Sequence, residues 1–217
     1  MEHLVKRYFK LNRFLLFVTG LWPYQSKWSA YLMRIINFTV LLISVSIQML
    51  TILTSEITLE FAINVLPMIL SPIGFMIQMY LRIKFIDKLK KLFKYMWDDW
   101  ALQKTHDEIK IMYEHAETTK LITLGYFSFT YLGMTLYNVW LYTPEILDII
   151  SPINESRPRI KLSYICLEFF IDEDRYFYFI RFYICIASFV TPLLSVACST
   201  LFVVFTQHVC AMCELLG

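Results

Sequence analysis

The sequence predicts an all-α fold: a polytopic membrane helix bundle with four transmembrane helices and a cytoplasmic N-terminus. Two features predict this class. Hydrophobic residues make up 58% of the 217 residues and charged residues 18%, against about 45–50% and about 25% in an average globular protein. A soluble domain of this length leaves a large fraction of its surface in water, so it could not bury this many apolar side chains in its core. The surplus is also gathered into long runs without charge, which a bilayer solvates and water does not.

Four of these runs are long enough to cross a membrane. A helix of about 20 apolar residues covers the ~30 Å hydrocarbon core. The runs of this length without Asp, Glu, Lys or Arg are residues 35–55, 61–81, 121–144 and 182–213. The last run, of 32 residues, would extend roughly 48 Å as one helix. We therefore expect it to tilt, to extend past the bilayer or to bend at Pro192.

The distribution of lysine and arginine sets the predicted orientation. Residues 1–34 carry six basic residues and residues 82–120 carry nine, whereas residues 56–60 carry none and residues 145–181 carry five beside seven acids. Cytoplasmic segments are enriched in Lys and Arg, so the first and third of these segments are predicted to face the cytoplasm. Asn154, in an Asn-Glu-Ser glycosylation acceptor, then lies outside, where glycosylation occurs.

The apolar segment 14–22 precedes the first predicted span and is too short to cross. No small-residue cleavage site follows it. We therefore expect a helix that lies at the membrane interface or re-enters it, rather than the core of a cleaved signal peptide. No repeat or low-complexity linker divides the chain, so residues 1–217 are predicted to form a single membrane domain.

An extended cytoplasmic helical hairpin is predicted between the second and third spans. Apolar residues from Ile86 to Trp100 recur every three or four positions with lysines between them, which is typical of an amphipathic helix. Thr105 and Glu108 have the spacing of a capping box, which predicts the start of a second helix. Basic amphipathic helices also bind anionic lipid or calmodulin, an alternative to a hairpin that packs only on itself.

The sequence predicts no enzyme, no cofactor and no nucleic-acid partner. The acidic residues at 98–99 and 172–174 are runs of the kind that water usually solvates, and the net charge is only +2. His208, Cys210 and Cys213 raise the alternative of a metal site. His208 is only two residues from Cys210 and therefore points to another helix face, so ordinary packing is favoured. The cysteines, mostly in an apolar run, are predicted to be buried thiols.

The third span carries a face that suits a ligand. No predicted span contains Asp, Glu, Lys or Arg, which argues against ion-coupled transport. Thr130, Gly133 and Tyr137 instead share one helix face at three- and four-residue spacing. Such a face of aromatic and small residues suits a binding site, although aromatic stripes in membrane helices also serve helix packing.

Several motifs, taken in chain order, resemble the insect odorant receptors. They are Gly20-Leu21-Trp22-Pro23, Trp97-Asp98-Asp99-Trp100, Glu114-His115-Ala116 with Lys120-Leu121, Phe170-Ile171-Asp172 with Tyr176-Phe177-Tyr178, Gln207-His208-Val209-Cys210 and Glu214-Leu215-Leu216-Gly217. Each motif is degenerate alone, and the resemblance rests on their order along the whole chain. Members of this family are seven-span, ligand-gated cation channels with a cytoplasmic N-terminus.

The resemblance implies an odorant-receptor subunit in the plasma membrane of olfactory sensory neurons. It implies a hetero-tetramer with a co-receptor subunit, and a small volatile odorant bound between the second, third, fourth and sixth spans in the outer half of the membrane. The residues that match this pocket by position are Thr130, Gly133, Tyr137, Met68, Val190 and Thr191. A ligand of about ten carbons gains roughly 8 kcal/mol on burial, and after association costs we expect micromolar or weaker affinity.

The sequence ends just after its fourth predicted span, whereas the family has three more, including the span that lines the pore. We therefore expect a fragment of a longer product that cannot conduct alone and whose odorant site is incomplete. Two other functions stay open. One is a taste receptor of the same superfamily, which the motif at 20–23 disfavours. The other is a non-signalling four-helix membrane scaffold, which would assemble without dependence on a ligand.

Overall fold

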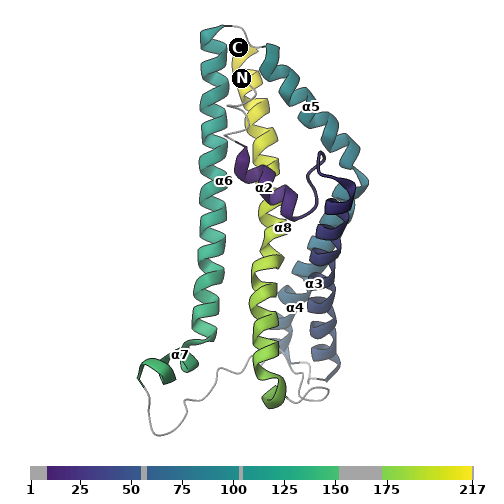
Figure 1. The fold of residues 1–217 in the computed structure, drawn as a ribbon, viewed down its shortest axis with the longest axis vertical. Coiled ribbons are helices and arrows are strands. Elements are labelled where there is room, and N and C mark those ends of the chain that lie inside the picture. The colour runs from purple at the N-terminus through teal and green to yellow at the C-terminus, as the bar shows by residue number, and fades with distance from the viewer. Residues whose placement is uncertain (1–8, 55–57, 103–104, 152–172, 217) are drawn as a thin grey trace.

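The computed structural model describes residues 9–54, 58–102, 105–151 and 173–216. Nearly all of these residues are helical, and no strand occurs within these four ranges. The helices are α2 (Lys10–Val18), α3 (Lys27–Thr54), α4 (Leu59–Lys84), α5 (Ile86–Leu102), α6 (His106–Leu141), α7 (Thr143–Ile150) and α8 (Glu173–Leu216), shown in Figure 1. The predicted all-α class is confirmed for the described residues.

Three of the described helices are long and apolar enough to cross a membrane. Their apolar stretches are Lys27–Leu50 in α3, Val65–Lys84 in α4 and Tyr178–Leu216 in α8, and they overlap the predicted spans 35–55, 61–81 and 182–213. In α3 and α4 only 17% of the stretch is buried within the chain. Exposed apolar surface on this scale needs lipid or another apolar partner, which indicates a membrane protein.

The predicted span 121–144 lies in α6, which is not one of these three helices. Thr, Ser, Tyr and Asn side chains alternate with its apolar residues and lower its hydropathy. Its predicted end is wrong by about one turn, because α6 ends at Leu141 and α7 begins at Thr143 with Pro144 in its first turn. Proline has no backbone N–H to donate and therefore suits the start of a helix rather than its interior.

The central element of the bundle is α8 (Figure 1). Its 44 residues extend roughly 66 Å, about twice the hydrocarbon core. Pro192 lies inside the helix. Along its length α8 packs against α6 on one side and against the α3–α4 pair on another, and α2 crosses it.

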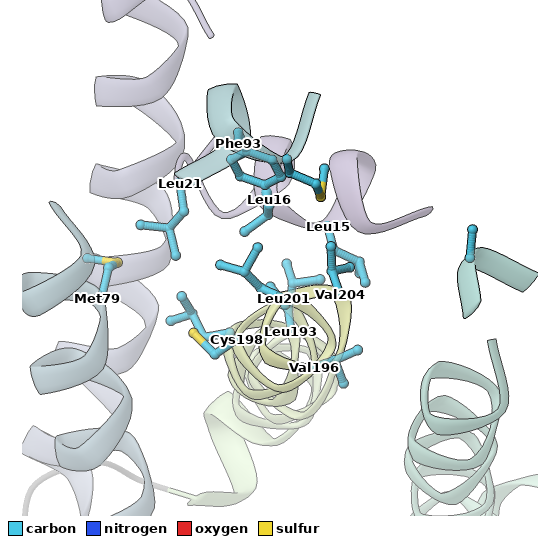
Figure 2. Packing of buried hydrophobic residues seen from close by; sticks show 14 of the residues in the cluster. Leu15, Leu16, Leu21, Met79, Phe93, Leu193, Val196, Cys198, Leu201 and Val204 are labelled. Atoms are coloured by element: carbon cyan, nitrogen blue, oxygen red, sulfur yellow. The ribbon is translucent and has the colours of Figure 1, made fainter. Parts of the chain in front are cut away.

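The buried core lies where α2, α5 and α8 meet. Leu15 of α2 and Leu21 in the following turn are 0% exposed. They pack with Phe93 of α5 and with Leu201 of α8 (Figure 2). The apolar segment 14–22 therefore forms a short helix and a turn, with one face buried in this core.

The hairpin between α4 and α6 begins and ends as the local sequence signals predict. Only Phe85 separates α4 from α5, so the second apolar helix passes almost directly into the amphipathic one. At the start of α6 the Thr105 hydroxyl oxygen accepts from the Glu108 amide at 3.3 Å, and the Glu108 carboxylate accepts from the Thr105 amide at 3.0 Å. The predicted capping box is confirmed.

Candidate functional site

The predicted ligand-binding residues of α6 lie on one flank of that helix. Thr130 and Tyr137 are half-buried, and Gly133 between them is exposed. A side chain added at Gly133 would meet no atom within 4 Å, so the chain leaves open space beside this residue. The Tyr137 ring lies 6.1 Å from the Trp140 ring, centroid to centroid. The flank thus combines an aromatic wall, a hydroxyl group and a gap.

The neighbouring face of α6 joins it to α8. The Tyr131 hydroxyl donates to the carbonyl of Phe189 at 3.2 Å, and the two rings stack with their centroids 6.1 Å apart. The predicted α8 residues Val190 and Thr191 directly follow Phe189 and are half-buried. The predicted α8 residues therefore adjoin this interface, whereas Thr130, Gly133 and Tyr137 lie on a flank of α6 outside the face that forms it.

Met68, the predicted residue of α4, is not brought to this interface. Its sulfur lies 3.9 Å from Nε2 of Gln48 on α3, and α4 packs against α3, α5 and α8. The described residues thus place the predicted set in two groups, one on the packed helices α6 and α8 and one on α4 where it packs against α3. Asn154, the predicted glycosylation site, lies outside the described residues.

Sequence reasoning missed a buried arginine at the start of the α8 apolar stretch. Arg181 is 3% exposed, donates to the carbonyl of Leu141, and lies 5.6 Å from the centre of the Tyr142 ring. It therefore neutralises the C-terminal end of α6, where free carbonyls carry partial negative charge. Arg181 directly precedes the predicted span 182–213, so the sequence alone assigned it to the loop. Its position at the boundary of an apolar run was the only sequence feature that could have indicated its role.

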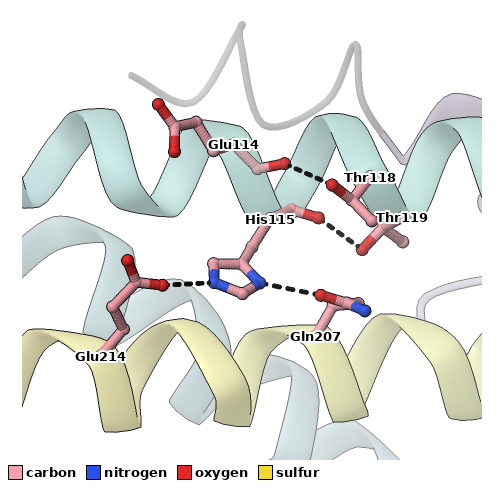
Figure 3. A network of polar contacts seen from close by, with 6 residues as sticks. All are labelled: Glu114, His115, Thr118, Thr119, Gln207 and Glu214. Atoms are coloured by element: carbon pink, nitrogen blue, oxygen red, sulfur yellow. Dashed lines mark hydrogen bonds and ion pairs between the residues drawn. The ribbon is translucent and has the colours of Figure 1, made fainter.

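At the other end of the α6–α8 interface, His115 bridges the two helices (Figure 3). Its Nδ1 lies 2.8 Å from Oε1 of Gln207 and its Nε2 lies 2.9 Å from Oε2 of Glu214. Both partner atoms are acceptors, so an imidazolium with two N–H groups satisfies both. The hydrogen bond to Gln207, and then that to Glu214, raises the pKa of His115 above its usual value.

A second histidine joins α8 to α5. Nε2 of His208 lies 3.0 Å from Oδ2 of Asp99, and the imidazole is only 11% exposed. A narrow crevice with room for roughly one water molecule lies between α5, α6 and α8, and His115, His208, Trp100 and Phe9 are among its lining residues. Sequence reasoning took Asp98 and Asp99 to be solvated, because no local pattern relates residues 109 positions apart.

Three of the segments that carry the family resemblance therefore meet in space. Residues 97–100 on α5, 114–116 on α6 and 207–214 on α8 are joined by the contacts of His115 and His208. Each of these contacts is a hydrogen bond between two helices: His115 joins α6 to α8, and His208 joins α8 to α5. This cluster holds three helix ends together.

Within the described ranges, no group of three or more His, Cys, Asp or Glu side chains is placed to hold a metal ion. His208 faces Asp99, whereas Cys210 and Cys213 are exposed. The metal-site alternative therefore finds no geometry in this part of the chain. The prediction that the cysteines are buried thiols is wrong for Cys210 and Cys213.

The chain matches no protein-family model, no curated protein and no solved structure. Its function has to be argued from its residues and their geometry.

Proposed function

We propose that the chain is an odorant-receptor subunit of the insect type. In this proposal it crosses the plasma membrane of an olfactory sensory neuron four times, binds a small volatile apolar ligand, and contributes to an odorant-gated cation channel with a co-receptor subunit. The observation that carries the proposal is the open flank of α6 at Thr130, Gly133 and Tyr137, beside the α8 interface. The ordered motifs that resemble the family support it.

Four crossings are supported by the path of the chain. The end of α4 and the start of the apolar stretch of α8 lie at opposite ends of the bundle (Figure 1). The 36 residues of α6 extend roughly 54 Å and return the chain from one end to the other, antiparallel to α8. If α4 and α8 each cross a bilayer, α6 has to cross it between them.

The chemistry of the flank suits a ligand with an apolar body and one polar group. The Tyr137 and Trp140 rings supply apolar surface, and the hydroxyl groups of Thr130 and Tyr137 supply hydrogen-bonding capacity. Medium-chain alcohols and esters have this composition. Because the binding energy comes mainly from burial of methylene groups, we expect micromolar or weaker affinity and tolerance of related ligands.

Two glycine substitutions on α6 test the ligand site. At both Gly133 and Gly125 an added side chain would meet no atom within 4 Å, so Gly133→Leu and Gly125→Leu should both fold. Saturation-transfer NMR on the chain in lipid nanodiscs, with empty nanodiscs as the baseline, measures binding of medium-chain alcohols and esters. We expect saturable binding that Gly133→Leu weakens about tenfold or more, the effect of losing roughly 1.4 kcal/mol.

Gly125→Leu is the matched control and should bind as the unsubstituted chain does. Equal binding by all three proteins would contradict the α6 site. Signals no greater than those of empty nanodiscs would contradict the ligand-binding role and favour the membrane scaffold.

Assembly with a co-receptor is tested separately. A tagged insect co-receptor subunit, co-expressed with this chain, should retain it through purification in mild detergent. An unrelated four-span membrane protein expressed at the same level should not be retained. Equal retention of both proteins would contradict a specific subunit interface.

A further inference from the structure

Basic and aromatic side chains gather where α4 passes into α5 and where α3 begins. We call this set the basic-aromatic rim. All its members are exposed: Lys27, Trp28 and Tyr31 on α3, and Lys84, Phe85, Lys88 and Lys91 at the α4–α5 junction. Trp28 is 81% exposed, an unusual state for so large an apolar side chain in water.

The two halves of the rim lie at the same depth. The antiparallel helices α3 and α4 pack side by side (Figure 1), and the contact between Gln48 and Met68 fixes their register. Counting the same number of residues from this contact reaches Tyr31 on α3 and Phe85 after α4. Because both helices rise equally per residue, Tyr31 and Phe85 are level with each other.

This depth is the end of the apolar stretches. The stretch in α3 begins at Lys27 and the stretch in α4 ends at Lys84. Aromatic residues with lysines at the ends of apolar helices are typical of the membrane–water interface. The ammonium groups of Lys84 and Lys88 lie 5.8 and 4.9 Å from the centre of the Phe85 ring, so their charges are held beside an apolar side chain that enters the interface.

The charge of the rim is mainly positive. On α5, Lys88 and Lys91 lie on a flank with the exposed Tyr95, at three- and four-residue spacing. Asp87, the acid in the first turn of α5, lies four positions before Lys91 and therefore beside it, so the rim sets four lysines against one neighbouring carboxylate. The rim thus presents ammonium groups at the depth of lipid headgroups.

We propose that the basic-aromatic rim binds the headgroups of anionic phospholipids in the cytoplasmic leaflet. The leaflet follows from the predicted orientation, and the proposal is independent of the odorant-receptor function. Basic segments beside membrane-spanning helices attract anionic lipid over a Debye length, and exposed Trp, Tyr and Phe side chains anchor them in the interface.

The rim fits a lipid surface better than an acidic calcium-sensor protein. Calcium-sensor proteins bind the apolar face of an amphipathic helix in a groove. The apolar face of α5 is already covered, since Phe93, Met96 and Trp100 are at most 5% exposed and belong to the core shared with α2 and α8. Its exposed side combines lysines with Leu92 and Tyr95, a combination that a headgroup layer and the membrane interface beneath it complement.

Retained lipid tests the proposal. The full chain is equilibrated in mild detergent with equal amounts of phosphatidylserine and phosphatidylcholine, repurified, and its bound lipids are quantified by mass spectrometry. We expect enrichment of phosphatidylserine that falls by about fivefold for each lysine removed in Lys84→Gln/Lys88→Gln. The enrichment should also fall as salt is raised, because screening shortens the range of the charges.

The matched control, Lys94→Gln/Lys110→Gln, removes the same charge from exposed positions outside the rim and should keep the enrichment. Lys27→Gln tests the α3 half of the rim and should lower it, which keeps the proposal testable if the double rim variant fails to fold. No preference for phosphatidylserine, or equal loss in the rim and control variants, would overturn the proposal. Binding of calcium-loaded calmodulin by a chain that shows no preference for phosphatidylserine would overturn it in favour of a protein partner.

Discussion

At the scale of single residues, Gly20 determines how the chain turns from α2 toward α3. Its φ angle is +71°, and its carbonyl accepts a hydrogen bond from Nε of Arg34 at 2.8 Å. A methyl group at this position would lie 2.7 Å from the carbonyl oxygen of Ala30, a backbone atom that cannot move aside. The motif at 20–23 therefore has a structural reason for its first residue.

Gly20→Ala should destabilise the protein by about 2 kcal/mol or more, since left-handed strain alone costs about 1–2 kcal/mol and the clash adds to it. Thermal unfolding in detergent measures the change as a lower midpoint. Gly125→Ala is the control with the opposite sign, because Gly125 lies open in α6 and alanine stabilises a helix interior by roughly 0.5–1 kcal/mol. Equal shifts in the two variants would contradict the role of Gly20.

His115 makes a residue-scale prediction about pH. Its pKa is raised in the folded protein by the hydrogen bonds to Gln207 and Glu214, with Glu114 adding a smaller contribution of the same sign. A raised pKa means that the folded state holds the proton more tightly than the unfolded state. The stability from these contacts is therefore complete below the unfolded pKa of about 6.5 and is lost as pH rises through the folded value.

The unfolding midpoint should accordingly fall as pH is raised above about 6.5, and the fall should be smaller in His115→Gln. Glu214→Gln, which removes the charge at 2.9 Å from Nε2, should also reduce the pH dependence while leaving the ring in place. Unchanged pH dependence in both variants would show that other groups are responsible.

At the scale of elements, the start of α6 depends on a local signal. The Thr105 side chain and the Glu108 carboxylate each satisfy a backbone amide of the first turn, and loss of such a cap costs about 1 kcal/mol. Thr105→Ala should therefore speed amide hydrogen exchange over residues 106–110. Thr118→Ala is the control, because that hydroxyl only bonds back to the carbonyl of Glu114 within the helix. Equal protection in Thr105→Ala and the unsubstituted chain would contradict the cap.

Elements of this kind can be predicted from sequence because their causes are local. The cap needs only Thr105 and Glu108, and an apolar run such as 61–81 needs only its own composition. Which way a helix faces its neighbours depends on residues far along the chain. The sequence therefore placed Met68 in an apolar run, but nothing local indicated that it contacts Gln48 on α3.

At the scale of the whole molecule, the composition predicted that lipid surrounds the helices, but it did not predict which helix lies at the centre of the bundle. The weak burial of α3 and α4 within the chain agrees with lipid around them, as their uncharged runs predicted. That α8 lies among α2, α3, α4 and α6 could not be predicted, because contacts such as His208 with Asp99 join positions 109 residues apart. The candidate site follows the same division: the spacing of Thr130, Gly133 and Tyr137 predicts that they share a face of α6, whereas Arg181 and the histidine contacts required the fold.

The orientation of the bundle is the remaining prediction at this scale. Of the twenty basic residues, six lie in 1–34 and nine in 82–120. The helices α3 and α6, which begin within these two segments, run in the same direction along the bundle (Figure 1). Retention of basic segments in the cytoplasm therefore places both the beginning of α2 and the α4–α5 junction inside. An epitope tag fused at Met1 should be reached by antibody only after cells are permeabilised, whereas a tag inserted beside Asn154 should be reached on intact cells. Staining of the Met1 tag on intact cells would show that the bundle has the opposite orientation. The open flank of α6 would then lie in the inner half of the membrane, and the receptor proposal would lose its topological support.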